Sequence, residues 1–309
     1  MSRPPRPEIR TIVRKALTLT ALRLRFLGHG WLAPAKGARL AEALFTTPLP
    51  GSRDRALRTP IGDAQLSHLD IDGDRIALYR WGDVGREPTV LFSHGWSSFG
   101  LRIAPWVPAL RAAGFAVAAF DQRGHGRSSG ERATLPDFGR TLGKVAARLG
   151  PVHAVIGHSL GGAATAMALA QGMRAGRSLL IAPAADGEAA LSRFGRLVGA
   201  GRGVLQRTMR ALERRTGWRF EDLTAQALVP RLATPSLIIH DLGDDEVPWE
   251  EGERYARFWP RAHLLNTEGL GHHRVLTAPQ VIDAGLAFLR GREVGTSVVS
   301  TLALPRGVC

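Results

Sequence analysis

The stretch GHSLGG, residues 157–162, decides the fold of this chain because of what stands on either side of it. An apolar strand pattern, VHAVIGH, leads into it, and a helical pattern, LGGAATAMALA, begins directly after Ser159. A serine on a sharp turn between a strand and a helix is the arrangement of a nucleophile elbow. Gly157 and Gly161 let the strand and the helix approach closely, while the backbone at the serine is strained. We therefore predict that Ser159 is a nucleophile rather than a polar residue of an ordinary glycine loop.

A serine hydroxyl is a weak nucleophile at neutral pH, so it needs a general base. His272, in EGLGHHRVL (268–276), is the best candidate among the ten histidines. It follows the last expected strand, and the glycines beside it allow a loop to fold over the edge of the sheet. His273 is the alternative base, and a loop histidine without a role is the plainer interpretation. His158 adjoins the serine, but neighbouring positions at an elbow point in different directions.

The histidine in turn needs an acid that fixes its tautomer and stabilises the imidazolium. The segment HDLGDDEVP (240–248) follows an apolar strand pattern and places several carboxylates on one loop, namely Asp241, Asp244, Asp245 and Glu246. The chain order serine, acid, histidine is the one expected for an elbow on an α/β sheet. The residues themselves leave the choice of acid open.

Acyl transfer also needs hydrogen-bond donors for the oxyanion that develops on the substrate. The backbone N–H of Leu160, directly after the nucleophile, is one expected donor. The second should come from the loop after an earlier strand, where LFSHGWSSFG contains the turn at residues 94–96. We expect the Trp96 N–H to point into the site, with a plain turn as the alternative.

From residue 66 onward, short apolar runs alternate with helical patterns, which predicts an α/β fold. Its sheet should be mostly parallel, with helices on both faces. LSHLDIDGDRIALYRW predicts two strands joined at Asp72-Gly73-Asp74. Further strands are expected at 89–95, 115–121, 152–159, 178–184, 236–241 and 262–269, and helices near 100–113, 137–149, 160–173 and 278–290. Residues 185–232 carry helical patterns without a strand, and we interpret them as a small, arginine-rich helical cap insertion.

The first 58 residues form a basic extension, with twelve Lys and Arg against three Asp and Glu. Apolar residues recur near a 3.6-residue period over residues 8–27, with cations between them, which predicts an amphipathic helix. This helix either packs on the main domain or a second subunit, or it lies on a membrane surface as a peripheral contact. At the other end, residues 292–309 are expected to form a flexible, frayed tail.

The composition excludes several classes of protein. No run of about 18 apolar residues occurs, so a membrane-spanning helix is not expected. The one cysteine, Cys309, allows no intrachain disulfide and fits a cytoplasmic protein. The net charge of +14 comes almost entirely from arginine and is typical of a biased base composition. No nucleic-acid motif and no metal-ligand cluster occurs, so neither nucleic acid, a metal nor another cofactor is expected, and the oligomeric state is not readable.

Taken together, these segments resemble the α/β-hydrolase superfamily over about residues 66–291, and we expect the domain itself to span residues 59–291. The matching pieces, in order, are HGW (94–96), DQRGHGRSSGER (121–132), GHSLGG (157–162), HDLGDDEVP (240–248) and GLGH (269–272). The resemblance assigns the nucleophile to Ser159 and the base to His272. The family's acid stands in a D-x-x-V-P pattern, which selects Asp244, with Asp245 second. Many members have His-Gly where this chain has His240-Asp241, which adds a carboxylate beside the acid.

Within the superfamily, DQRGHGRSSGER followed by LPDFGRTLGKV is similar to the serine-hydrolase branch of monoacylglycerol lipases and lysophospholipases. The resemblance implies a cofactor-free esterase that acts on a small-molecule ester, lipid-derived esters included, through an acyl-enzyme. A thioesterase, peptidase, acyltransferase or perhydrolase would use the same triad, and a non-catalytic binding protein is the alternative from another class. Asp121 to Ser128 read mainly as structural, with a substrate role for Arg123 or His125 as the alternative.

Overall fold

The computed structural model describes residues 9–298, with side chains from residue 17 onward, and divides the chain into two compact units. One unit combines the residues up to Thr46 with Gly187–Phe220. The other combines Thr47–Asp186 with the residues from Glu221 onward. Cys309 and the tail from residue 299 lie outside the described residues.

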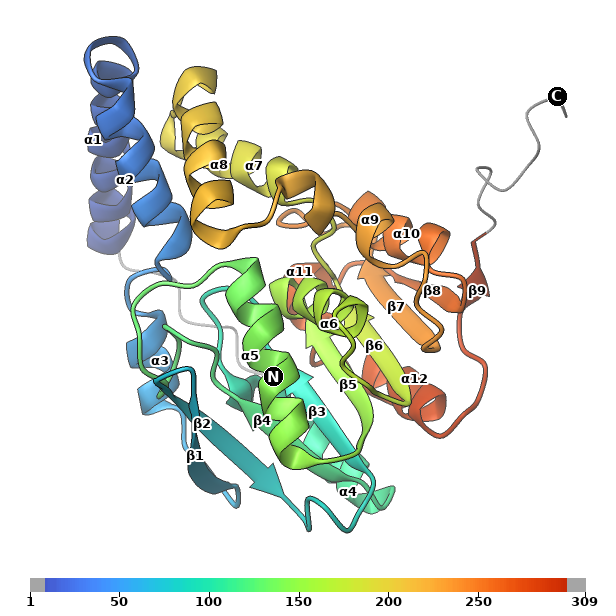
Figure 1. The fold of residues 1–309 in the computed structure, drawn as a ribbon. Helices are drawn as coiled ribbons and strands as arrows, with labels where there is room; N and C mark the ends of the chain where they lie inside the picture. Colours follow the sequence, from blue (N-terminus) through green and yellow to red (C-terminus); the bar gives the residue numbers. More distant parts are fainter. Residues whose placement is uncertain (1–8, 299–309) are drawn as a thin grey trace, which may run out of the picture. The chain divides into compact units, whose positions relative to one another are not determined.

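A single sheet forms the centre of the larger unit, with the strand order β1-β2-β4-β3-β5-β6-β7-β8-β9 (Figure 1). The neighbours among β3 to β8 pair in parallel, whereas β1, β2 and β9 add antiparallel pairs. The strands are β1 (Gln65–Ile71), β2 (Asp74–Trp81), β3 (Thr89–Ser93), β4 (Ala116–Phe120), β5 (Val152–His158), β6 (Arg177–Ile181), β7 (Ser236–Asp241), β8 (Ala262–Thr267) and β9 (Thr296–Ser297). This confirms the predicted, mostly parallel α/β fold.

Helices cover both faces of this sheet, because alternate residues of each strand point to opposite sides. On one face, Val90 and Phe92 of β3 pack in a core with Trp106 and Leu110. On the other, Leu91 packs in a core with residues of α5 and α6. The helical segments of this unit are α3 (Ser52–Arg58), η1 (Gly100–Trp106), α4 (Val107–Ala112), α5 (Leu135–Leu149), α6 (Leu160–Ala170), η2 (Phe220–Leu223), α9 (Ala225–Leu228), α10 (Trp249–Phe258), α11 (Gly271–Arg274) and α12 (Pro279–Leu289).

The smaller unit is entirely helical among its described residues. It consists of α1 (Ile9–Leu32), α2 (Pro34–Thr46), α7 (Gly187–Val198) and α8 (Arg202–Thr216). Phe26 of α1, Ala41 of α2, Val198 of α7 and Val204 of α8 are buried in one common core. The basic extension and the inserted helices therefore fold together, although about 140 residues of chain separate them. The unit ends at Thr46, and α3, which the composition groups with the extension, belongs to the sheet unit.

The predicted strand pair around Asp72-Gly73 is confirmed: β1 and β2 pair antiparallel, and both turn residues have positive φ.

The C-terminal segment differs from the expectation. The prediction of a frayed tail from residue 292 is wrong for Thr296 and Ser297, which pair as β9 with β8. A two-residue pairing carries no periodic pattern, so the sequence alone does not reveal it.

Candidate active site

Ser159 lies on a sharp turn between β5 and α6, with φ of 55° and ψ of −123°. Its N–H donates a hydrogen bond to the Ile181 carbonyl of β6, 2.9 Å away, and its own carbonyl accepts from the N–H of Gly162. A positive φ is strained for a residue with a side chain and is typical of functional turns. The backbone is thus held on both sides of the serine, whose side chain remains partly exposed.

Glycines beside the serine are required by close approaches of the backbone. A Cβ on Gly157 would lie 2.6 Å from the Gly161 carbonyl oxygen. A Cβ on Gly161 would lie 2.6 Å from the carbonyl oxygen of His94 and closer still to that of Ser93. Real Cβ atoms do not make such contacts. The two glycines therefore let β5, α6 and the end of β3 meet at the elbow, as the sequence predicted.

The predicted base and one predicted acid are in direct contact. His272 lies in α11, and its Nδ1 is 2.7 Å from Oδ2 of Asp244 in the loop after β7. Both side chains are buried. Because an ionised carboxylate only accepts hydrogen bonds, Nδ1 carries the proton and Nε2 is left as the basic nitrogen of the ring.

The surroundings of Asp244 favour its ionised form. Its Oδ1 accepts hydrogen bonds from the N–H groups of Glu246 and Val247, at 3.0 and 2.9 Å. On the side of Oδ2, the His240 Nε2 lies 3.4 Å away in addition to His272. Burial by itself raises the pKa of Asp244, but the hydrogen bonds from His240 and His272 outweigh it and hold this pKa well below its usual range.

The other carboxylates of this loop have different partners. Asp241 accepts from the Thr267 hydroxyl and the Leu270 N–H through Oδ2, and from the Gly243 N–H through Oδ1. Glu246 pairs with His273 at 2.9 Å, and this hydrogen bond raises the pKa of His273. The structure thus brings His272 together with Asp244, and not with Asp241. His273, the alternative base, faces solvent and binds Glu246 instead.

The loop after β3, which carries the expected donor Trp96, lies against Ser159. A Cβ on Gly95 would lie 2.9 Å from the Cβ of Ser159, so the backbone just before Trp96 passes directly beside this serine. Leu160 is the first residue of α6, where helical N–H groups have no intrahelical acceptor. Among the hydrogen bonds found within residues 9–298, none uses the N–H of Trp96 or Leu160.

Two buried histidines, His94 and His125, hold the loop after β3 in place, and no local sequence pattern predicts this role for either. The Nε2 of His94 accepts a hydrogen bond from the Gln122 N–H, and the Nε2 of His125 accepts one from the Ser97 N–H. Each Nδ1 donates to a backbone carbonyl, that of Gly95 or Arg123. Burial lowers the pKa of His94 to about 4 and that of His125 to about 3. Both rings are therefore neutral, and His125 has a structural role in the described fold.

The side chain of His158, the residue before the serine, contacts the backbone of the predicted base, His272. Its Nε2 lies 2.9 Å from the carbonyl oxygen of His272, and the two rings are 5.0 Å apart. A carbonyl only accepts, so Nε2 carries the proton. Burial lowers the pKa of His158 to about 3, which keeps the ring neutral. This contact places His272 beside the elbow. The sequence had predicted no role for His158.

Comparisons with known proteins fit this arrangement. A family model described as serine aminopeptidase S33 matches residues 86–234. Mouse alpha/beta hydrolase domain-containing protein 10 superposes with a TM-score of 0.59 at 20% identity, over 74% of this chain and 97% of that one. The chain has the α/β-hydrolase fold. A bacterial membrane phospholipase A, described as a virulence factor, has the same fold, with a TM-score of 0.59 at 19% identity over 90% of this chain and 98% of that one.

A curated relative of this chain is a monoacylglycerol lipase from Mycolicibacterium smegmatis (strain ATCC 700084 / mc(2)155). It is 36% identical over 108 residues, which cover 32% of this chain and 39% of that protein. The match therefore spans about two fifths of the relative's length.

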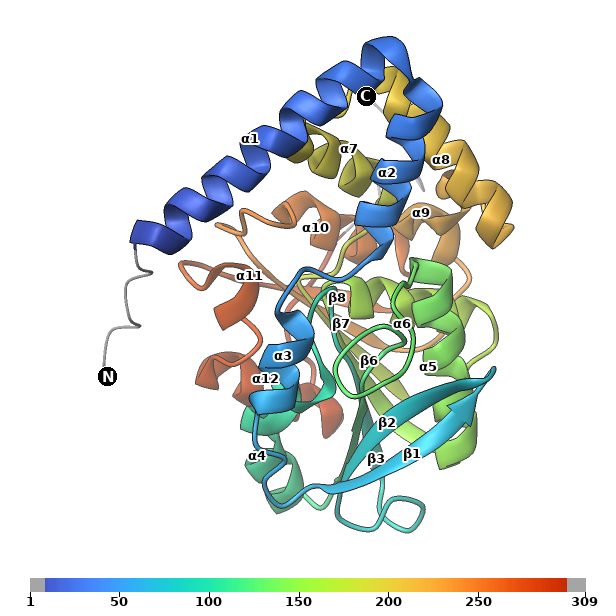
Figure 2. The ribbon, with the colours of Figure 1, turned by 90° about the vertical axis from the view of Figure 1, so that its left-hand side faces the viewer.

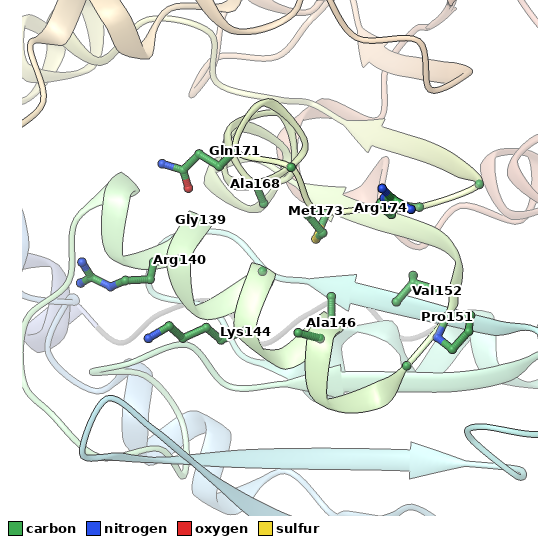
Figure 3. Close-up of a pocket in the computed structure, with 16 residues that line it drawn as sticks. Gly139, Arg140, Lys144, Ala146, Pro151, Val152, Ala168, Gln171, Met173 and Arg174 are labelled. Atoms are coloured by element: carbon green, nitrogen blue, oxygen red, sulfur yellow. The ribbon is translucent and has the colours of Figure 1, made fainter.

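Other features of the structure lie away from the elbow. A surface pocket of about 650 Å³ opens between α5 and the residues after α6 (Figure 3). Its lining includes Arg140, Lys144 and Arg174, but none of Ser159, Asp244 and His272. Within residues 9–298, no cluster of His, Cys, Asp and Glu could hold a metal ion. None of the helices described for this chain is long and apolar enough to cross a membrane.

Proposed function

We propose that this protein is a serine hydrolase that cleaves carboxylic esters through an acyl-enzyme. The observation that carries the proposal is the buried contact of 2.7 Å between His272 Nδ1 and Asp244 Oδ2, next to a serine on a strained elbow. This is the arrangement of nucleophile, base and acid that acyl transfer requires. The sequence order and the family match support the same roles.

In the first half of the reaction, Ser159 Oγ attacks the ester carbonyl while His272 Nε2 takes its proton. The electron pair of the carbonyl moves onto oxygen, and the Trp96 and Leu160 N–H groups donate to this oxyanion. When the tetrahedral intermediate collapses, the C–O bond to the alcohol breaks, and His272 gives its proton to the leaving alkoxide. The products are a free alcohol and an acyl ester on Ser159.

In the second half, a water molecule takes the place of the alcohol. His272 removes a proton from the water, whose oxygen attacks the acyl carbonyl, and the same two N–H groups receive the oxyanion. Collapse breaks the bond to Ser159 and returns the proton to its Oγ, which releases the carboxylic acid. Asp244, held ionised by its donors, stabilises the imidazolium in both halves and keeps the proton on Nδ1.

Lipid-derived esters are the substrate class that we propose. The curated relative is a monoacylglycerol lipase, and one protein of the same fold is described as a membrane phospholipase A. A peptidase is the second candidate, because the matching family model is described as a serine aminopeptidase. An amide places greater demands on protonation of its leaving group, but the roles of Ser159 and His272 would be the same.

A labelling experiment with a fluorophosphonate probe tests the chemistry independently of the substrate. We expect Ser159 to be labelled in the wild type, and Ser159→Ala to take no label while remaining folded. Activity on a series of p-nitrophenyl esters from acetyl to palmitoyl, set against amino-acid p-nitroanilides, then separates an esterase from a peptidase. A folded protein that takes no label would refute the proposal of a serine hydrolase. The remaining hypothesis would then be a non-catalytic binding protein.

Matched carboxylate variants test the choice of acid. Asp244→Asn removes the charge that pairs with His272, whereas Asp245→Asn changes the neighbouring carboxylate, which is exposed. We expect the first to abolish most of the ester hydrolysis and the second to leave it near the wild-type value. Equal activity of the two variants would contradict the assignment of Asp244.

A further inference from the structure

The positive charge of the chain is concentrated in the helical unit. Residues 9–46 and 187–220 hold 15 Lys and Arg against three Asp and Glu, a net charge of +12. The whole chain carries +14, with 41 Lys and Arg against 27 Asp and Glu. A biased base composition would spread arginine evenly over both units and cannot by itself explain this segregation. The concentrated positive charge of the helical unit therefore favours binding to an anionic partner.

The long helix α1 has two apolar faces, of which one is exposed over its described side chains. Phe26 and Leu22, four residues apart, face the core shared with α2, α7 and α8. Leu17, Leu24 and Trp31 follow one another at intervals of seven residues, so they share another face of the helix. These three side chains are 65%, 64% and 88% exposed.

This apolar stripe extends along the helix and ends at its turn into α2. Leu27 is 64% exposed and falls one turn after Leu24, and Leu32, the last residue of α1, is also exposed. Figure 2 shows α1 and α2 as two helices that meet at this turn. Several large apolar side chains in one exposed row are more than the scattered leucines of an ordinary surface and indicate an interaction site.

Arginines accompany the stripe within the same unit. On α1, Arg23 and Arg25 lie on opposite flanks of the stripe, and the Arg23 Nε also donates to the Leu197 carbonyl of α7. On α8, Arg207, Arg210 and Arg214 are exposed, and their spacing of three and four residues puts them on one face. Another side of α8 is buried and carries Val204, Thr208 and Leu212.

We propose that the helical unit is a docking module for anionic phospholipid bilayers. The row Leu17–Leu24–Leu27–Trp31 would enter the interface between headgroups and acyl chains, with α1 in the plane of the membrane. The arginines of α1 and α8 would remain at the level of the lipid phosphates. A tryptophan at one end of such a row suits this depth, because its ring is apolar and its N–H polar.

Charge distinguishes the bilayer from a second copy of this chain as the occupant. An isologous dimer through α1 would bring two units of +12 together, and their repulsion would oppose association. An anionic lipid surface instead gains favourable energy from each cation that it meets. The proposal does not depend on the proposed esterase activity, and its test measures binding alone.

The test is co-sedimentation of the full chain with vesicles of phosphatidylcholine, alone or with 30% phosphatidylglycerol, in 0.15 M salt. We expect binding to the mixed vesicles and much weaker binding to the neutral ones. Leu24→Gln/Trp31→Gln should weaken binding to the mixed vesicles by about tenfold or more, because two large apolar side chains no longer enter the interface. The matched control, Leu49→Gln/Leu57→Gln, changes leucines of the sheet unit that are 65% and 51% exposed and should bind like the wild type.

A second variant tests the cations, and a second measurement tests the dimer. Arg207→Gln/Arg210→Gln/Arg214→Gln should lower binding to the mixed vesicles by on the order of a hundredfold, with little change on neutral ones. Equal binding of wild type and both variants to the two kinds of vesicle would overturn the proposal. So would sedimentation equilibrium that finds a dimer which Leu24→Gln/Trp31→Gln dissociates. These side chains are exposed, so circular dichroism should show that the variants stay folded.

Discussion

Glycine-to-alanine substitutions at two positions should show whether Gly161 is required by the close backbone approach at the elbow or only affects stability through its helix propensity. In Gly161→Ala the added Cβ would lie 2.6 Å from the His94 carbonyl oxygen and closer to that of Ser93. Both atoms belong to the backbone, so no side-chain rotation relieves the contact. Gly143→Ala is the matched control in α5, where a Cβ meets nothing within 4 Å. The two variants add the same methyl group to a helix.

The two variants should change the free energy of unfolding in opposite directions. Overpacking of a core costs about 1–3 kcal/mol when side chains can move, so a contact with fixed carbonyls should cost about 3 kcal/mol or more. Alanine at position 143 should instead stabilise by up to about 1 kcal/mol, because alanine favours the helix over glycine. Urea unfolding followed by circular dichroism measures both values.

Function should follow the same difference. The shift that accommodates a Cβ at position 161 moves the turn that presents Ser159, so fluorophosphonate labelling should slow by at least tenfold. Gly143→Ala should be labelled at the wild-type rate. A Gly161→Ala protein with wild-type stability and labelling rate would refute the reasoning that this glycine is required by the close approach.

Three further outcomes follow from the hydrogen bonds of the site. Asp244→Asn should lower kcat on a p-nitrophenyl ester by about 10³-fold or more with little change in KM, and an unchanged kcat would exclude this acid. His158→Phe should lower kcat about tenfold by removing the donor to the His272 carbonyl, whereas His158→Gln, which keeps a donor, should lose less. The neutral rings of His94, His125 and His158 have pKa values of about 4, 3 and 3, so below pH 6.5 only the unfolded chain takes up their protons. Stability should therefore fall from pH 7 to pH 5 by on the order of 1–2 kcal/mol per ring, and urea midpoints that do not change over this range would contradict the burial of these groups.

The sheet and the elbow were readable from the sequence because both depend on local patterns. Strands buried on both faces, such as β3 and β7, are short and continuously apolar, and they alternate along the chain with amphipathic helical patterns. GHSLGG adds a backbone constraint that few other residue combinations meet. The contact between His272 and Asp244 agrees with the pattern of the resemblance, since both residues follow strands that end at the same edge of the sheet.

The association of α1 and α2 with α7 and α8 could not be read in the same way. An amphipathic pattern predicts that α1 has an apolar face, but not which distant segment covers it. The apolar residues of α1 even form two faces, and only the structure shows that the Phe26 face is buried while the Trp31 face is exposed. The roles of His94 and His158 were hidden for a related reason. Their partners lie 28 and 114 residues away, and no local pattern joins them.

The departure from His-Gly to His240-Asp241 shows how two neighbouring carboxylates come to differ. Both oxygens of Asp241 accept hydrogen bonds from the chain, and two of these donors, Thr267 and Leu270, lead into the turn that carries His272. Burial alone raises the pKa of Asp241, but the Leu270 N–H and its other donors outweigh this and keep the group ionised. Asp241 therefore cannot turn toward the imidazole without leaving backbone N–H groups unpaired, which costs more than one new hydrogen bond gains. In the proposed triad the extra carboxylate therefore does not compete with Asp244: Asp241 binds the segment that leads to His272, and Asp244 binds the ring.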